Sequence, residues 1–295
     1  MLSFKKVTFD DKEMINSYLS INRFKNSEYN FTTIMAWQFV YETTYTIEQN
    51  CLLLQGLSEG KAYFYFPLGR RENVKPALQS LMAHCKEAGL PLALVNLSSE
   101  MLAILEEIGM LDLFDREERR DAADYIYLHD KLVSLSGKKL HGKKNHLNFF
   151  NNNYISQLVP IDDTNIEACE KMLKTEIAER STRPYEELNA TFMALRYRDR
   201  LGLVGRALFA DGVLVGVILA ECHHNMALLQ IAKADTSYRG ASVALFQMFL
   251  SANCHQCQYV NFMEDLGIEG LRRAKLSYDP DHLVEKSILH LKETL

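Results

Sequence analysis

The stretch "QIAKADTSYRGASVALFQMFL", residues 230–250, decides how the second half of the chain folds. Its apolar start predicts a strand, its small residues predict a turn, and the apolar run from Ala241 to about Asn253 predicts a helix. The first backbone N–H groups of such a helix have no partner within the helix, and the helix dipole adds positive potential there. The pattern therefore predicts an anion site at the amides of residues 239–244, to which the Arg239 side chain adds a fork of donors.

The segments around this stretch repeat one order of elements in both halves of the chain. The N-terminal half predicts strands at 4–9, 50–56, 61–69, 92–97 and 123–128, and helices at 12–20, 72–87 and from Ser98 or Ser99 to Gly109. The C-terminal half predicts strands at 156–161, 226–235 and 258–262, a hairpin that turns at Asp211-Gly212, and helices at 162–180, from Pro184, and at 241–253.

This repeated order predicts a duplicated α+β domain with mixed sheets flanked by helices. The join is expected in "LSGKKLHGKKNHLNFFNNNY", residues 135–154, where the composition turns basic and then rich in asparagine. We therefore expect domains at 1–150 and 151–295.

Composition limits the classes of partner and location. With 47% hydrophobic residues, 24% charged residues and a formal charge of −5, the chain is of the ordinary globular class, so a polyanion would need a local basic patch. The six cysteines follow no disulfide framework, which indicates a reducing compartment. The first residues lack the apolar core of a signal peptide, and no apolar run is long enough to cross a bilayer. We expect a cytoplasmic protein with at most peripheral membrane contact.

A second stretch, "EDLGIEGLRRAKLSYDP" at residues 264–280, gathers Arg272, Arg273 and Lys275 within about one helical turn. Like charges at this spacing repel, so they need either the chain's own carboxylates or an anionic ligand. On a helix Arg272 and Lys275 share one face and Arg273 points elsewhere. Pairing with neighbouring carboxylates in solvent is the simpler alternative, but two glycines and Tyr278 beside the cations favour a functional site.

Two further groups of residues are candidates for binding phosphate or a metal ion. The run "SGKKLHGKKNHLNFF", residues 136–150, places Lys138, Lys139, Lys143 and Lys144 where they would follow phosphates, although a solvated face is the alternative. Cys254-His255-Gln256-Cys257, with Cys222, His223 and His224 upstream, lacks the second cysteine pair of a zinc ribbon. We therefore expect buried thiols and no metal site.

The three stretches resemble known families. Residues 239–244 resemble the cofactor loop of GNAT N-acyltransferases, which cradles the pyrophosphate of coenzyme A, with Ser242 where that family has glycine. Gly270, Lys275 and Tyr278 resemble the C-terminal pattern of the Fem-type peptidyltransferases, with Ala274 and Asp279 at the departures. Together with "DYIYLHDKLVSLSGKKLHGKKNHLNFF", residues 124–150, they resemble an uncharacterised bacterial family related to the C-terminal catalytic domain of phosphatidylglycerol lysyltransferase.

This resemblance implies two tandem GNAT-like domains and an acyl- or aminoacyltransferase. Its donor would bear phosphate, as aminoacyl-tRNA or a coenzyme A thioester, and its acceptor would be an amine or hydroxyl. Catalytic roles are expected for Lys275, Tyr278, Glu264, Asp235 and Glu221. Donor binding is expected at Tyr238, Arg239, Gly240, Ser242, Ala244 and Arg272, and phosphate binding at Arg273 and the four lysines of residues 138–144. The alternatives are an acetyl-CoA-dependent N-acetyltransferase and a non-catalytic anion-binding module.

Overall fold

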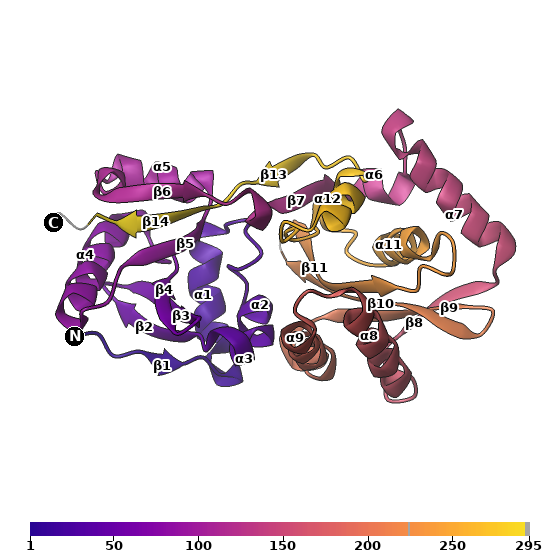
Figure 1. Ribbon diagram of the computed structural model, residues 1–295, viewed down its shortest axis with the longest axis horizontal. Helices are drawn as coiled ribbons and strands as arrows, with labels where there is room; N and C mark the ends of the chain where they lie inside the picture. The colour runs from indigo at the N-terminus through magenta and orange to yellow at the C-terminus, as the bar shows by residue number, and fades with distance from the viewer. Residues whose placement is uncertain (224, 293–295) are drawn as a thin grey trace. The chain divides into compact units, whose positions relative to one another are not determined.

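The computed structural model describes residues 1–223 and 225–292, and the chain divides into two compact units (Figure 1). Unit 1 is Met1–Ala123 together with the C-terminal segment from Val284, and unit 2 is Asp124–Leu283. Each unit consists of a mixed sheet with helices packed on it. The predicted class of two α+β domains with mixed, helix-flanked sheets is confirmed.

The sheet of unit 1 runs in the order β1-β2-β3-β4-β5-β14-β6. Its strands are β1 (Lys5–Lys6), β2 (Thr44–Glu48), β3 (Cys51–Ser58), β4 (Lys61–Phe64), β5 (Ala93–Leu97), β6 (Phe114–Glu118) and β14 (Ser287–Leu291). Neighbouring strands are antiparallel except for β4 and β5, which are parallel. A parallel pair needs a crossover, and α4 provides it.

The helices of unit 1 follow the signals in the sequence. They are α1 (Lys12–Asn22), α2 (Phe31–Ala36), α3 (Gln38–Tyr41), α4 (Arg71–Ala88) and α5 (Ser99–Glu107). The long helix α4 buries Val74, Leu78 and Leu81 on one face and ends at Gly89, whose φ of 64° suits glycine. The predicted helices at 12–20, 72–87 and 98–109 are therefore present with small shifts at their ends.

The sheet of unit 2 runs in the order β13-β7-β12-β11-β10-β9-β8. Its strands are β7 (Asp124–Leu128), β8 (Ser156–Pro160), β9 (Val204–Ala210), β10 (Val213–His223), β11 (Met226–Ala234), β12 (Tyr259–Asn261) and β13 (His282–Val284). The predicted hairpin forms between β9 and β10, where Asp211 and Gly212 both have positive φ, 50° and 80°, as a tight hairpin turn requires. β11 and β12 form a parallel pair.

Helices cover both faces of this sheet (Figure 1). They are α6 (His129–Ser134), α7 (His141–Asn153), α8 (Ile166–Arg180), α9 (Pro184–Arg196), α10 (Arg198–Leu201), α11 (Ala241–Ala252) and α12 (Glu269–Leu276). α8 packs on one face of β10 and α11 on the other, where α6 and α7 in turn contact α11. The apolar face of α11, with Leu245 and Phe249, lies in the core of the unit.

The order of segments along the chain does not reveal which sheet β7 and β14 join. β7 was expected to close the first domain, but it lies in the sheet of unit 2 between β12 and β13. β14, from the end of the chain, lies in the sheet of unit 1 between β5 and β6. The observed division at residues 123–124 thus differs from the expected boundary near 150, because strand pairing between distant segments decides which unit a strand joins.

Two local expectations also differ from the structure. The segment 135–154, expected to join the domains, contains α7, whose Phe150 is fully buried in unit 2. The cysteines, expected to remain separate buried thiols, include a Cys222–Cys254 disulfide, because β10 and the end of α11 bring these two residues together. Tertiary packing produces both results.

Candidate functional site

The strands β11 and β12 of unit 2 diverge at their carboxyl ends. Their pairing begins at Met226–Tyr259 and ends at Leu228–Asn261, while β11 continues to Ala234. The chain after β12 instead stays with β7, since the Phe262 amide donates to the Tyr125 carbonyl at 3.0 Å and the Tyr125 amide donates to the Met263 carbonyl at 3.3 Å. Ligands of open α/β sheets characteristically bind beyond the carboxyl ends of such strands.

Lys275 holds this diverging segment in place. Its ammonium donates to the carbonyl oxygens of Phe262 at 2.6 Å and Met263 at 3.1 Å, and also to that of Glu264. An ammonium has three donors, so these carbonyls occupy all of them. The residue predicted to stabilise an oxyanion therefore has a positioning contact in the structure: it fixes the loop that carries Glu264.

Arg272 is bound to a buried carboxylate. Its guanidinium contacts both oxygens of Asp265, at 2.8 and 2.9 Å, and Asp265 is fully buried. The Tyr125 hydroxyl donates to Asp265 at 2.6 Å and the Gly267 amide donates at 2.8 Å. Burial alone would raise the pKa of the Asp265 carboxyl, but the hydrogen bonds from Arg272, Tyr125 and Gly267 outweigh it and lower the pKa to about 2. The carboxylate therefore stays charged and anchors the start of α12.

Tyr278 lies at the junction of the second stretch with the basic run. It is 6% exposed, its ring packs edge-on against those of Phe246 and Tyr127, and burial raises the pKa of its phenol. The Lys143 ammonium lies 4.0 Å from the centre of this ring. Partial burial lowers the pKa of Lys143, while the negative face of the ring favours its charge. The two stretches, more than 130 positions apart, meet here.

Asp279 adds a second link between the same stretches. It has a φ of 54°, a left-handed conformation that glycine adopts without strain. This conformation explains why the Fem-type pattern has a glycine at this position. Its carboxylate accepts hydrogen bonds from Lys131 and, at 2.8 Å, from Lys139. The hydrogen bonds from Lys131 and Lys139 lower the pKa of this carboxyl.

The remaining lysines lie at the start of α7. Lys138 and Lys144 are exposed and, with His141, line an open pocket of about 420 Å³ whose other walls are Leu135, Ser136 and Gly137. Within residues 1–223 and 225–292, neither Lys138, Lys143 nor Lys144 contacts a carboxylate. Lys138 and Lys144 line this pocket and are available to an anionic ligand, while the ammonium of the neighbouring Lys143 lies over the Tyr278 ring.

The turn between β11 and α11, predicted to hold donor phosphate, lies against α7. Gly240 has a φ of 92°, and a methyl group added there would lie 2.3 Å from the His146 carbonyl oxygen of α7. The Arg239 guanidinium lies 4.5 Å from the centre of the Phe149 ring, and Tyr238 packs on Tyr154. The backbone of α7 thus occupies the space in front of Gly240.

The other predicted residues are spread over unit 2. The Asp235 carboxylate accepts from the Ser237 amide at 2.8 Å and so shapes the turn before α11. Ser242 and Ala244 lie in the first turn of α11, Glu221 lies on β10 opposite Leu228, and the exposed Arg273 lies 3.8 Å from Glu269. The roles of Tyr125 and Lys131 are not visible in the sequence, because only the fold brings β7 to Asp265 and α6 to Asp279.

The profile of one protein family matches residues 20–290 of the chain, and that family is described as phosphatidylglycerol lysyltransferase, C-terminal. The chain belongs to this family. The resemblance noted in the sequence is thereby confirmed over nearly the whole chain. A curated relative, the uncharacterised protein MYCGA3080 of Mycoplasmoides gallisepticum, is 26% identical over 172 residues, which cover 57% of this chain and 56% of that protein. The chain thus matches little more than half the length of this relative.

Solved structures agree with the family. A conserved protein of unknown function from Bacteroides thetaiotaomicron is 31% identical, with a TM-score of 0.92 over 99% of this chain and 100% of the other. The C-terminal domain of a putative lysylphosphatidylglycerol synthetase from Agrobacterium fabrum has 12% identity and a TM-score of 0.67, covering 97% and 93% of the two chains. A tandem GNAT protein of clavulanic acid biosynthesis has 11% identity and a TM-score of 0.52, covering both chains in full. The tandem GNAT-like fold of this family member is therefore established.

Within the described residues of this family member, none of the helices combines the length and hydrophobicity that a bilayer-spanning segment requires.

Proposed function

We propose that this protein is an aminoacyltransferase that takes its aminoacyl group from an aminoacyl-tRNA and passes it to an amine or hydroxyl acceptor. Membership of the phosphatidylglycerol lysyltransferase C-terminal family supports the reaction class. The observation that carries the choice of donor is the group of Lys138, Lys143 and Lys144 around the start of α7, two of which, Lys138 and Lys144, line an open pocket.

The position of these lysines is unfavourable unless an anion is bound. The N-terminus of a helix carries partial positive charge, so cations in its first turn cost a few tenths of a kcal/mol each and anions are attracted. The first turn of α7 contains no acidic residue, and the preceding Leu140 supplies no side-chain cap. A phosphate backbone that follows this turn would satisfy both the helix amides and the ammonium groups.

The covered turn at Gly240 favours tRNA over coenzyme A. A methyl group on Gly240 would lie 2.3 Å from the His146 carbonyl oxygen and 3.0 Å from the Phe150 Cβ, so α7 crowds the turn at which the pyrophosphate of coenzyme A was expected. The phosphates of tRNA bind instead along the exposed lysines of α7 in this proposal. The alternative of an acetyl-CoA-dependent enzyme has no comparable support.

The reaction needs one nucleophilic substitution at a carbonyl. The acceptor nitrogen or oxygen bonds to the carbonyl carbon of the aminoacyl ester, the bond from that carbon to the ribose oxygen breaks, and the acceptor proton ends on the ribose hydroxyl. Glu264, which follows the diverging end of β12, is the proposed general base, with Glu221 as a second half-buried candidate; the half-buried Asp235 already accepts from the Ser237 amide. Lys275 and Arg272 are proposed as positioning residues, since their charges hold the loop that carries Glu264.

The test is the binding of aminoacyl-tRNA as a function of salt. Each phosphate neutralised on a duplex contributes about 0.9 to the slope of log K against log salt, so three lysines give a slope of about −3. The double variant Lys138→Gln/Lys144→Gln should flatten this slope by about 2. Single-turnover transfer from tRNA charged with a labelled amino acid, with Glu264→Gln and Glu221→Gln, then identifies the base.

The matched control is Lys171→Gln/Lys174→Gln, which removes the same charge from exposed positions of α8. Its slope should equal that of the wild type. Equal slopes for both double variants, or no binding of aminoacyl-tRNA at low salt, would refute the proposed donor. A rise in melting temperature with acetyl-CoA but not with tRNA would point to the alternative enzyme.

A further inference from the structure

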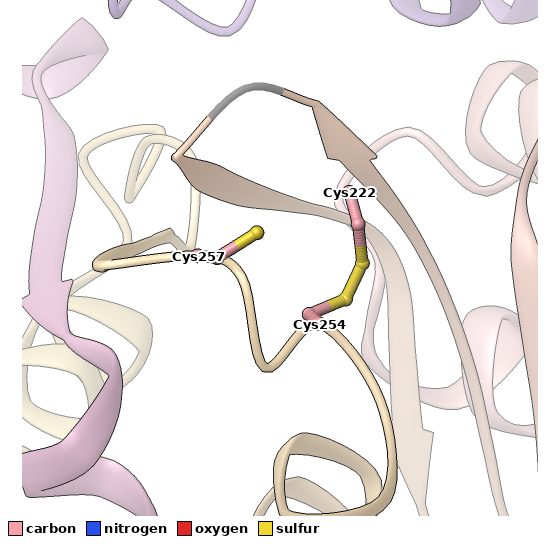
Figure 2. A group of neighbouring side chains, drawn as sticks. All are labelled: Cys222, Cys254 and Cys257. Atoms are coloured by element: carbon pink, nitrogen blue, oxygen red, sulfur yellow. A yellow bond between two sulfur atoms is a disulfide. The ribbon is translucent and has the colours of Figure 1, made fainter.

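Three cysteines of unit 2 lie together at one end of its sheet (Figure 2). Cys222 is near the end of β10, Cys254 follows α11, and Cys257 precedes β12. Their sulfur atoms all lie within 4.8 Å of one another. Cys222 and Cys254 are joined as a disulfide, with Cα atoms 5.6 Å apart, and Cys257 is a buried free thiol that points toward this pair. The disulfide explains why Cys222 and Cys254 lie together, but it does not explain why the thiol of Cys257 lies beside them.

The backbone around these residues is held by hydrogen bonds. The Cys257 amide donates to the Cys254 carbonyl at 2.9 Å, which closes the Cys-x-x-Cys segment into a turn. The next two amides, of Gln258 and Tyr259, both donate to the Asn225 carbonyl at 2.7 and 3.0 Å. Asn225 lies in the turn between β10 and β11, so the Cys-x-x-Cys turn is tied to the hairpin that carries Cys222. These backbone hydrogen bonds therefore hold the three cysteines close to one another.

The spacing of the sulfurs suits a tetrahedral metal ion. Zinc binds thiolates at about 2.3 Å, which places the sulfurs of a tetrahedral site about 3.8 Å apart. The three sulfurs lie within 4.8 Å of one another, and after reduction of the disulfide the Cys222 and Cys254 side chains must rotate to bring their two sulfurs to this spacing. Two cysteines separated by two residues form one of the usual binding turns of thiolate zinc sites, and Cys222 supplies the third ligand from a different segment.

We propose that the reduced form of this cluster, Cys222, Cys254 and Cys257, binds one Zn²⁺ through three thiolates. A dithiol reductant first supplies two electrons and two protons to the disulfide and is itself oxidised to a disulfide. The three thiols then release three protons as three Zn–S bonds form. A water completes the tetrahedron. The ion would tie β10, the end of α11 and the start of β12 together.

The sequence alone predicts that these cysteines bind no metal, because it contains one Cys-x-x-Cys pair and a zinc ribbon needs two. The fold supplies the missing ligand from β10, where the sequence shows a lone Cys222. The test must therefore separate a three-thiolate site from a simple disulfide.

The experiment is to purify the full chain with a dithiol reductant and zinc, remove loosely bound metal by gel filtration, and measure zinc per chain by mass spectrometry. We expect about one equivalent. Replacement by Co²⁺ should produce the visible bands of a tetrahedral ion and an intense thiolate-to-cobalt charge-transfer band in the near ultraviolet. The variant Cys257→Ser should lose the metal and the charge-transfer band while retaining the Cys222–Cys254 disulfide after oxidation, since that bond does not involve residue 257.

The matched control is Cys169→Ser, which removes another buried thiol of unit 2, on α8, and should keep one equivalent of zinc. Should Cys257→Ser fail to fold, the metal content and cobalt spectrum of the wild type still decide the question. Zinc far below one equivalent in the reduced wild type overturns the proposal. So does equal zinc content in Cys257→Ser and wild type, or a Cys222–Cys254 disulfide that persists in dithiol with no metal taken up.

Discussion

The buried carboxylate of Asp265 offers a direct test of how the start of α12 is held. The variant Asp265→Asn keeps the shape of the side chain and removes the charge that faces Arg272. The pKa of Asp265 is about 2 in the folded protein, against an ordinary value of 3.8. One pKa unit corresponds to about 1.4 kcal/mol, so the charged form stabilises the folded state by about 2 kcal/mol at neutral pH. A loss of this size lowers the melting temperature by about 4 to 8 °C.

The stabilisation by the Asp265 carboxylate depends on pH in a predictable direction. Because folding lowers the pKa of Asp265, the stabilisation is fully present above the ordinary value of 3.8 and disappears as the pH falls through about 2. Scanning calorimetry at a series of pH values should therefore show the variant well below the wild type at neutral pH, with the two converging as the pH falls from 4 toward 2.

Glu269→Gln on the same helix is the control. Glu269 and Arg273 are both highly exposed and 3.8 Å apart, so this change should alter the free energy of unfolding by less than about 0.5 kcal/mol. Equal losses in the two variants, or an Asp265→Asn protein as stable as the wild type at pH 7, would refute the anchoring role of Asp265.

Two further predictions concern the contacts around the candidate site. Gly240→Ala should destabilise the protein by about 2 kcal/mol more than Gly137→Ala, measured by urea unfolding. Both positions have positive φ, but only at Gly240 does the new methyl group meet backbone, that of His146. Similar losses would mean that α7 does not press on this turn. Lys275→Met should cost about 3 kcal/mol and speed amide hydrogen exchange in residues 262–266, because three carbonyls lose a charged donor. Unchanged amide exchange in these residues would show that Lys275 does not hold this segment in place.

The elements that depend on local signals were predictable from the sequence. The turn at Asp211-Gly212 and the helix α11 after Gly240 form where the turn chemistry and apolar periodicity place them. The duplicated α+β class followed from the repeated order of such elements, and the GNAT-like fold from the resemblance of residues 239–244 and 264–280 to known families. By contrast α7 was missed, because its lysines and asparagines hide the few apolar positions, such as Phe150, that it buries.

The candidate site was predictable only as a set of segments. The sequence indicated the lysines of residues 138–144 and the cations of α12, but it assigned Lys275 and Arg272 to a ligand. In the structure the Lys275 ammonium donates to three backbone carbonyls, and the Arg272 guanidinium binds the Asp265 carboxylate. Which partner neutralises a cation depends on which carbonyls and carboxylates folding places within about 3 Å, and residue spacing along the chain does not encode that.

By itself, then, the sequence determined the fold class and the segments that bear charge, because these depend on periodicity, turn residues and local composition, and its motifs indicated the family by resemblance. Tertiary structure decided that β7 joins the sheet of unit 2 and β14 the sheet of unit 1, that α7 lies against Gly240, and that Cys222 meets Cys254 and Cys257. The physical reason is that strand pairing and side-chain packing join residues far apart in the chain. The free energy of these contacts depends on the whole core and not on any one segment.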